Sequence, residues 1–306
     1  MSNTVLELKN VSKSFGKRKV IDNISLEVKE GEIYGFLGPN GSGKTTTIKM
    51  ILRLIDLDNG TIKVNGYDVK KQFEQAMECI GAIVENPDLY KYMSGVENLK
   101  LHARIRNISN TRINEVLKLV ELKDRAKDKV GKYSLGMKQR LGLALTLLHK
   151  PKVLILDEPT NGLDPAGIKL LRDILKEIAH KEKVAVFVSS HISSEMQLMC
   201  DKVAVIDNGK VVKIEKITNE EETIETLEIR VEEKEKAVNL LKEKFNLDCK
   251  VVENNIEAKI LTEQIPIVVK ELALAEVRIK AIIPKEHSLE EIFFNATEGG
   301  NNDKNI

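Results

Sequence analysis

The chain is poor in residue types that mark specialised small proteins. Its 306 residues include no tryptophan and only three cysteines, Cys79, Cys200 and Cys249. An odd number of cysteines without CxxC or other metal-ligand spacing does not outline a disulfide framework or a zinc site. A disulfide-stapled secreted scaffold and a zinc-finger protein are therefore excluded.

Long apolar runs and an excess of one charge are also missing. No run approaches the 18 or more residues of a membrane-spanning helix, and the first ten residues contain no apolar signal-peptide core. Lys+Arg number 48 and Asp+Glu 47, so the net charge is only +1. This balance argues against a nucleic-acid-coating protein. We expect a soluble, cytosolic chain that needs another polypeptide if it acts across a membrane.

What the sequence does contain fits a folded protein of two domains. Apolar residues make up 42% and charged residues 31% of the chain, and its length is about twice the roughly 150 residues of a typical domain. Short apolar strands alternate with amphipathic helices, which indicates a mainly parallel α/β core. We expect strands at 5–8, 24–28, 32–37, 153–156 and 184–189, a hairpin at 61–69 around Asn65-Gly66, and mainly helix over 70–148.

The C-terminal part has a different order of predicted strands and helices. Residues 226–283 alternate in the order β-α-β-β-α-β, which is the split βαβ pattern of ferredoxin-like domains. We therefore divide the chain into an α/β domain at 1–217, with a helical subdomain at about 85–150, a linker at 218–225 and a ferredoxin-like α+β domain at 226–296. We expect a short helix at 288–295 to close this domain and 297–306 to be a flexible tail.

A phosphate-binding loop carries the strongest functional signal. Residues 38–45, Gly-Pro-Asn-Gly-Ser-Gly-Lys-Thr, match G-x-x-x-x-G-K-[ST] between a buried strand and a helix. Glycines let backbone N–H groups turn inward onto phosphate oxygens at the helix N-terminus. Lys44 would reach the β- and γ-phosphates of ATP, and Thr45 would ligate Mg²⁺. The predicted nucleotide-binding residues of this loop are Gly38, Pro39, Asn40, Gly41, Ser42, Gly43, Lys44, Thr45 and Thr46.

A second motif ends another buried strand in two carboxylates. Val-Leu-Ile-Leu at 153–156 leads directly into Asp157 and Glu158. Unpaired charge at the end of a buried strand is costly, so the two acids are expected to have a purpose. Asp157 would hold Mg²⁺, and Glu158 would activate the attacking water as general base.

These motifs and three others resemble the ATP-binding subunits of ABC transporters over residues 4 to 217. The segment 133–140, Tyr-Ser-Leu-Gly-Met-Lys-Gln-Arg, resembles the family signature, 161–164 resembles the D-loop, and His191 follows a strand as the switch histidine. The resemblance implies a RecA-like P-loop core with an antiparallel β subdomain and a helical subdomain. It also implies that Phe15 stacks on adenine and that His191 contacts the γ-phosphate.

In this family two chains sandwich two ATP molecules. The resemblance therefore implies that Ser134 and Gly136 face the γ-phosphate bound by the other chain, and that Asp164 of the D-loop also binds nucleotide. Ser134 and Gly136 are also expected to cap the helix that runs to about Leu148, whose N-terminus would face a phosphate. Leu135 replaces a glycine of the usual signature, and Met137 replaces a glutamine.

Glu85 stands where the family has a glutamine that meets Mg²⁺. A carboxylate oxygen still suits a hard cation, so Glu85 joins Thr45 and Asp157 as a predicted metal ligand. Together with the signature, the run Glu-Asn-Pro at 85–87 resembles the bacitracin-resistance and lantibiotic export or immunity branch. The resemblance implies an ATPase subunit of a bacterial exporter at the cytoplasmic face of the membrane. It would act as a homodimer or heterodimer with integral membrane permease subunits, contacted near 86–96, and without nucleic acid.

Two other functions stay open at this point. An ABC ATPase of translation or DNA repair commonly carries two cassettes or a coiled-coil or zinc insertion, and this chain has one phosphate loop and neither insertion. A nucleotide-gated regulatory module would bind a small ligand through its C-terminal domain. Co-purification with ribosomes or DNA would favour the first, and a ligand-induced thermal shift would favour the second.

Overall fold

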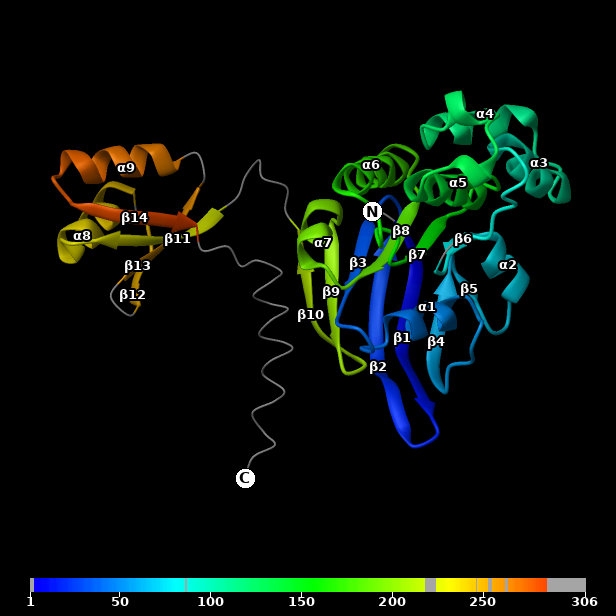
Figure 1. Ribbon diagram of the computed structural model, residues 1–306. Helices are drawn as coiled ribbons and strands as arrows, with labels where there is room; N and C mark the ends of the chain where they lie inside the picture. Colours follow the sequence, from blue (N-terminus) through cyan, green and yellow to red (C-terminus); the bar gives the residue numbers. More distant parts are fainter. Residues whose placement is uncertain are drawn as a thin grey trace. The chain divides into compact units, whose positions relative to one another are not determined.

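The computed structural model describes residues 3–85, 87–217, 224–245, 247–252, 255–261 and 264–284. They fall into two compact units, one within 3–217 and one within 224–284 (Figure 1). The predicted helix at 288–295, the tail at 297–306 and residues 218–223 of the predicted linker lie outside the described residues. No helix within the described residues is long and apolar enough to cross a membrane.

A four-stranded antiparallel sheet, in the order β2-β1-β4-β5, forms one layer of the first unit. Its strands are β1 (Thr4–Phe15), β2 (Arg18–Lys29), β4 (Asn59–Val64) and β5 (Tyr67–Asp68). The predicted hairpin is confirmed, because β4 and β5 pair on either side of Asn65-Gly66. Both turn residues have the positive φ that a tight primed turn requires, 49° and 84°.

The second layer is a six-stranded sheet in the order β10-β9-β3-β8-β7-β6. All neighbouring strands run parallel except the edge strand β10, which pairs antiparallel with β9. The strands are β3 (Ile33–Leu37), β6 (Ile80–Ile83), β7 (Val153–Asp157), β8 (Ala185–Ser190), β9 (Lys202–Asp207) and β10 (Lys210–Lys216). Every residue of β3, β7 and β8 is buried, as their continuous apolar sequences predict.

The two layers share one apolar core with helix α1 (Lys44–Ile51). Ile48, Met50 and Ile51 of α1 belong to the same buried cluster as residues of both sheets. The ring of Phe187 lies 5.4 Å from that of Phe36 and 6.1 Å from that of Tyr34, centroid to centroid. Burial of this helix and these rings fixes where α1 begins, and so positions the loop before it.

A helical part covers the end of the six-stranded sheet near β6 (Figure 1). It contains α3 (Gly95–Ile105), α4 (Asn110–Leu119), the 3-10 turns η1 (Lys123–Arg125) and η2 (Val130–Lys132), and α5 (Leu135–Leu147). The other helical elements of the first unit are α2 (Phe73–Glu78), α6 (Pro165–Lys176), the π-helical turn η3 (Glu177–Lys181) and α7 (Ser193–Met199).

The expectation of mainly helix over 70–148 is wrong at Ile80–Ile83. These residues form β6, which pairs parallel with β7. A Cβ on Gly81 would lie 2.6 Å from the carbonyl oxygen of Thr146, so α5 packs against this strand more closely than any larger residue allows. Four residues are too few to reveal a strand by periodicity, and the pairing with β7 decides their conformation.

The second unit has the element order β-α-β-β-α-β. Its elements are β11 (Ile224–Val231), α8 (Lys234–Phe245), β12 (Cys249–Val252), β13 (Asn255–Leu261), α9 (Ile265–Leu274) and β14 (Ile279–Pro284). The strands form an antiparallel sheet in the order β12-β13-β11-β14. Alternate residues of β11 and β13 pack with Ala237, Leu241, Val268 and Leu272 of the two helices into a separate core.

Candidate functional site

Three neighbouring parallel strands bring the sequence motifs to one edge of the six-stranded sheet. In the register of β3, β8 and β7, Leu37 lies opposite Ser190 and Asp157 lies opposite Ser189. The carboxyl ends of the three strands are therefore level, and the segments that follow them start side by side. This is the edge at which open α/β sheets bind ligands.

The loop between β3 and α1 has a backbone that requires glycine at two positions. A Cβ on Gly38 would lie 2.5 Å from the carbonyl oxygen of Ile206, and one on Gly43 would lie 2.4 Å from Cδ1 of Ile21. Gly43 also has φ 112°, and it precedes α1 without a side-chain cap. The first N–H groups of α1 are thus left for another acceptor, which suits an anion such as phosphate.

Lys44, Glu158 and His191 form one charged cluster in front of this loop. The ammonium of Lys44 is 5% exposed and donates to the carbonyl oxygens of Gly38 at 2.8 Å and Pro39 at 3.2 Å. Glu158 accepts from Lys44 at 3.2 Å through Oε1 and from Nδ1 of His191 at 2.6 Å through Oε2. Because a carboxylate only accepts hydrogen bonds, Nδ1 of His191 carries the hydrogen. The structure therefore brings the three predicted catalytic residues together.

Asp157 and Thr45 have the chemistry of a magnesium site, although the site is not a preformed cage. Asp157 is 5% exposed and accepts from the hydroxyl of Ser189 at 2.6 Å through Oδ1. Within the described residues, no group of three or more His, Cys, Asp or Glu side chains is gathered to hold a metal. This agrees with how Mg²⁺ binds, through one or two carboxylates, hydroxyl or water oxygens and substrate phosphates. Glu85 is exposed after β6, with φ 67°, and does not line the cavity at the loop.

A cavity of about 530 Å³ opens at the phosphate loop. Of the residues predicted to bind nucleotide or act in catalysis, those that line it are Phe15, Asn40, Gly41, Gly43, Lys44, Thr45, Thr46 and Glu158. Gly38, Pro39 and Ser42 belong to the same loop without lining the cavity, and the buried hydroxyl of Ser42 has no hydrogen-bond partner among the described residues. Sequence reasoning missed three further lining residues, Arg18, Val20 and Asn161. Asn161 lies in the predicted D-loop, and this position was the feature of the sequence that could have identified it as a site residue.

Phe15 lies at the edge of this cavity with a ring that is 51% exposed. The ammonium of Lys13 lies 5.4 Å from the ring centroid, within the range of a cation–π contact. Asp58 holds Lys13 at 2.9 Å and also accepts from the backbone N of Ser14 at 2.7 Å. The hydrogen bond from Lys13 lowers the pKa of Asp58 below its usual value. Lys13 and Asp58 were missed because 45 residues separate them.

Ser134 and Asp164 lie together in a second groove, apart from the phosphate loop. Both are N-caps: Ser134 accepts from the backbone N of Met137 at 3.3 Å at the start of α5, and Asp164 accepts from that of Gly167 at 3.1 Å at the start of α6. Gly136 lines the same groove from the first turn of α5. The expected capping role thus holds for Ser134 and is wrong for Gly136, which lies inside the helix.

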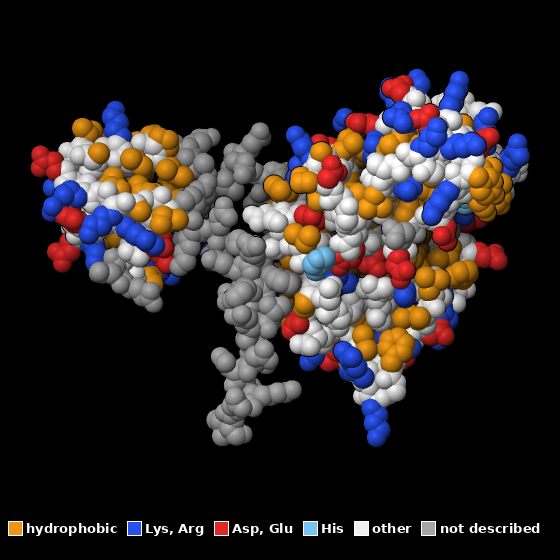
Figure 2. Space-filling model, viewed as in Figure 1, with side chains coloured by type: hydrophobic (Ala, Val, Ile, Leu, Met, Phe, Trp, Pro, Cys, Tyr) orange, Lys and Arg blue, Asp and Glu red, His pale blue; other side chains and the backbone are white. Residues whose placement is uncertain are grey.

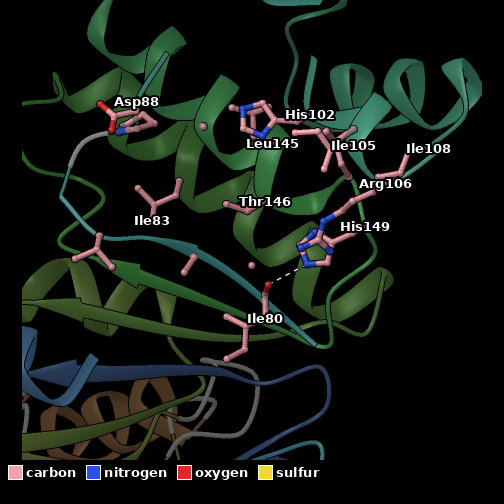
Figure 3. Close-up of a pocket in the computed structure, with 16 residues that line it drawn as sticks. Ile80, Ile83, Asp88, His102, Ile105, Arg106, Ile108, Leu145, Thr146 and His149 are labelled. Carbon is pink, nitrogen blue, oxygen red and sulfur yellow. Dashed lines mark hydrogen bonds between the residues drawn. The ribbon is translucent and has the colours of Figure 1, made fainter. Parts of the chain in front are cut away.

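A third hollow of about 400 Å³ lies between β6, α3 and α5 (Figure 3). Ile83 and Leu145 line it, together with Asp88, His102, Arg106 and His149. The Nε2 atom of His149 lies 2.9 Å from the carbonyl oxygen of Ile80, drawn as a dashed line in Figure 3. Burial lowers the pKa of His149 below 6.5, so the ring is neutral at pH 7 and donates this hydrogen bond.

Charges of both signs are mixed on the face drawn in Figure 2. Lys and Arg side chains lie among Asp and Glu side chains on each unit, in keeping with the net charge of +1. Several Asp and Glu side chains gather near the middle of the first unit in this view.

Comparison with known proteins identifies relatives along almost the whole chain. An uncharacterized ABC transporter ATP-binding protein of Bacillus subtilis, YhcH, is 47% identical over 296 residues, 96% of each chain. The bacitracin transport ATP-binding protein BcrA of Bacillus licheniformis is 42% identical and covers 80% of each chain. The lantibiotic transport ATP-binding protein SrtF of Streptococcus pyogenes is 39% identical over 73% of this chain and 95% of its own.

Solved structures match the first unit. The ATP-binding subunit of an ABC transporter superposes with a TM-score of 0.62 at 30% identity, covering 70% of this chain and 90% of its own. A bacterial ABC transporter cassette with a dimeric structure has a TM-score of 0.62 at 25% identity, covering 70% of this chain and 99% of its own.

The family model described as ABC transporter matches residues 21–161, which span the phosphate loop, the signature segment and the acidic strand. The phosphate loop, the Lys44–Glu158–His191 cluster and the capped groove all lie on a RecA-like α/β core. This geometry and the similarities to known proteins support the same assignment. The chain belongs to the ABC transporter family, and it is an ATP-binding, ATP-hydrolysing subunit of the type that dimerises and works with membrane permeases.

Proposed function

We propose that two copies of this chain bind Mg²⁺–ATP between them and power an exporter of peptide antibiotics, lantibiotics or drug-like molecules. The observation that carries the proposal is the separation of the predicted nucleotide contacts into two regions of one chain. Lys44, Thr45 and Glu158 line the cavity at the loop, whereas Ser134 and Asp164 line a groove elsewhere. Two chains placed face to face would join each cavity to the partner's groove.

In this proposal Thr45 and Asp157 would hold Mg²⁺, with Glu85 as a further oxygen donor. The bound ion would offset negative charge on the phosphates. Lys44 would exchange Glu158 for a phosphate oxygen, since one ammonium cannot hold both fully. Glu158 would then accept the proton of the attacking water, and His191 would hold a γ-phosphate oxygen once its own bond to Glu158 opens. Phe15 would stack on adenine.

The hollow between β6, α3 and α5 is our proposed contact for the permease. It is lined by apolar side chains together with two histidines, Arg106 and Asp88, and it opens beside the segment 87–96, within the range that the sequence suggested. Ile105 of α3 is 78% exposed at its edge, so an apolar side chain is available there to a partner. A subunit held there would work on the cytoplasmic face of the membrane. Asn86 lies outside the described residues.

The antibiotic substrates follow from the relatives. BcrA is a bacitracin transport protein, SrtF is a lantibiotic transport protein, and LnrL of Bacillus subtilis, 37% identical over 69% of this chain, is a linearmycin resistance protein. Strains carrying this chain and its permease should survive higher doses of one of these classes. A Lys44→Ala strain should lose that survival, because phosphate binding is lost. Equal survival of the two strains with every class would contradict the proposal.

Docking can be tested apart from hydrolysis. Ile105→Glu places a charge at the edge of the hollow, and Leu54→Glu, at a residue 63% exposed outside it, is the matched control. We expect Ile105→Glu to abolish co-purification with the membrane permease while ATPase activity of the isolated chain is kept. Leu54→Glu should co-purify normally. Retained binding by Ile105→Glu would remove the hollow from the interface.

A further inference from the structure

Ser189 lies where the two acidic residues of the site meet. It is the penultimate residue of β8, is fully buried, and stands opposite Asp157 in the register of the two parallel strands. The predicted site did not include it. A buried hydroxyl at this depth must find hydrogen-bond partners, and both of its partners belong to the acidic motif.

The single hydroxyl of Ser189 makes two bonds with defined directions. The backbone N–H of Glu158 donates to its oxygen at 3.0 Å, and the hydroxyl lies 2.6 Å from Oδ1 of Asp157. Since an N–H can only donate, the oxygen of Ser189 is the acceptor toward Glu158. Its one hydrogen is then free for Asp157, and the short distance is typical of an O–H donor on a carboxylate.

The bond to Glu158 supports an unusual backbone conformation. Glu158 has φ 49°, in the left-handed region that L side chains rarely adopt. Such a conformation persists only where the surroundings fix it, and here Ser189 holds the N–H of Glu158 while the N–H of Asn161 donates to its carbonyl at 3.2 Å. This backbone directs the side chain of Glu158 toward Lys44 and His191.

The bond to Asp157 fixes the rotation of that carboxylate. With Oδ1 committed to Ser189, Oδ2 is the oxygen left to face a cation or its water. A group that orients a metal-binding carboxylate in this way commonly affects metal affinity or activity by 10- to 100-fold.

We propose that Ser189 is a positioning residue that aligns both acids of the site through one hydroxyl, orienting Asp157 for Mg²⁺ and holding the backbone of Glu158 for proton transfer. This inference rests on the proposed roles of Asp157 and Glu158. It predicts that removal of one oxygen atom, at a buried position that does not line the cavity, weakens metal-dependent binding and turnover together.

The test compares Ser189→Ala with Ser189→Thr, which keeps a hydroxyl, and with Ser190→Ala. Ser190 is the matched control because it is 1% exposed and its hydroxyl accepts from the backbone N of Ile192 instead. Ser189→Ala should lower kcat about tenfold with KM for ATP within about twofold. It should also raise, several-fold, the Mg²⁺ concentration needed for binding of a non-hydrolysable ATP analogue, while binding in EDTA is unchanged. Ser189→Thr should restore both quantities at least in part.

Three results would overturn the proposal. They are wild-type kcat and Mg²⁺ dependence in Ser189→Ala, equal losses in Ser190→Ala, and no recovery in Ser189→Thr when melting curves show all variants folded. A fall in Tm alone would likewise reduce Ser189 to a structural residue. Glu158→Gln serves as a separate check: if it hydrolyses ATP at the wild-type rate, the proposed base is wrong, and the Mg²⁺ readout still tests Ser189 through Asp157.

Discussion

The two regions assigned to ATP differ in how their side chains are held. At the phosphate loop, Lys44 and His191 both bind Glu158 directly, although the three residues come from separate segments of the chain. In the groove, the side chains of Ser134 and Asp164 each accept a hydrogen bond from the first turn of their own helix, α5 or α6. The first region is organised within one chain. The second presents two helix N-termini outward, where a phosphate from outside the chain would be favourably bound.

Mixing two inactive variants is the strongest way to break this comparison. Lys44→Ala removes the phosphate ligand from the cavity, and Ser134→Arg blocks the groove, so each variant alone should lose about 100-fold or more in ATPase rate. In an equimolar mixture half of the randomly formed dimers contain one of each, and one of their two sites is intact. About a quarter of wild-type activity should return.

The measurement is ATPase rate against the mixing ratio, with melting curves to show that both variants fold. A mixture no more active than its components would mean that the groove does not complete the site of a second chain.

The cavity itself can be divided into a base-binding part and a phosphate-binding part. Phe15→Ala should weaken ATP binding about five- to tenfold through lost stacking, and Lys13→Met about two- to threefold through the lost cation–π contact. Neither should change binding of inorganic tripolyphosphate, which has no base. Titration of both ligands checks this, and equal losses for both would show that Phe15 and Lys13 act on the loop rather than on adenine.

Glu85 lines neither the cavity nor the groove in the structure. Its proposed role as a metal ligand can therefore be tested separately from both regions. Glu85→Gln should raise the half-saturating Mg²⁺ concentration about threefold, because a neutral amide oxygen binds a hard cation less strongly than a carboxylate does. Mg²⁺ titrations of ATPase activity check this for the isolated chain and for the chain with its permease. An unchanged Mg²⁺ requirement in both would remove Glu85 from the metal site.

The smallest effect concerns how the helix carrying Ser134 is tied to the core. His149 follows the far end of α5 and holds Ile80 of β6. Its pKa lies below the usual 6.5, so below about pH 6.5 the unfolded chain binds a proton that the folded chain does not. Stability is therefore lost as the pH falls from 6.5 toward the lowered pKa.

Between pH 7.5 and 5.5 the Tm of the wild type should fall more than that of His149→Gln, by about 1–2 °C, since the ring is half-buried and solvent screens its charge. Parallel falls in the two proteins would assign the pH effect to other groups.

Local patterns were enough to predict much of this molecule. The phosphate loop, the hairpin around Asn65-Gly66 and the helix at 234–245 depend on residues adjacent in sequence, and their types are readable there. The strand at Ile80–Ile83 was not, because its conformation depends on pairing with β7 about 70 residues away. The roles of Ser189 and Asp58 could not be predicted for the same reason. Each is an ordinary polar residue in the sequence, and only the fold places it beside a distant carboxylate or amine.

The contact between Lys44 and Glu158 has a consequence for when ATP hydrolysis can begin. The ammonium of Lys44, which would bind the incoming phosphate, is the group that pairs with Glu158, the proposed base. In the proposed mechanism, Glu158 would be released to accept a proton from water only when phosphate replaces it at Lys44. Binding of ATP would therefore prepare the site for its own hydrolysis, and a subunit without ATP would keep Glu158 paired with Lys44 rather than with a water molecule.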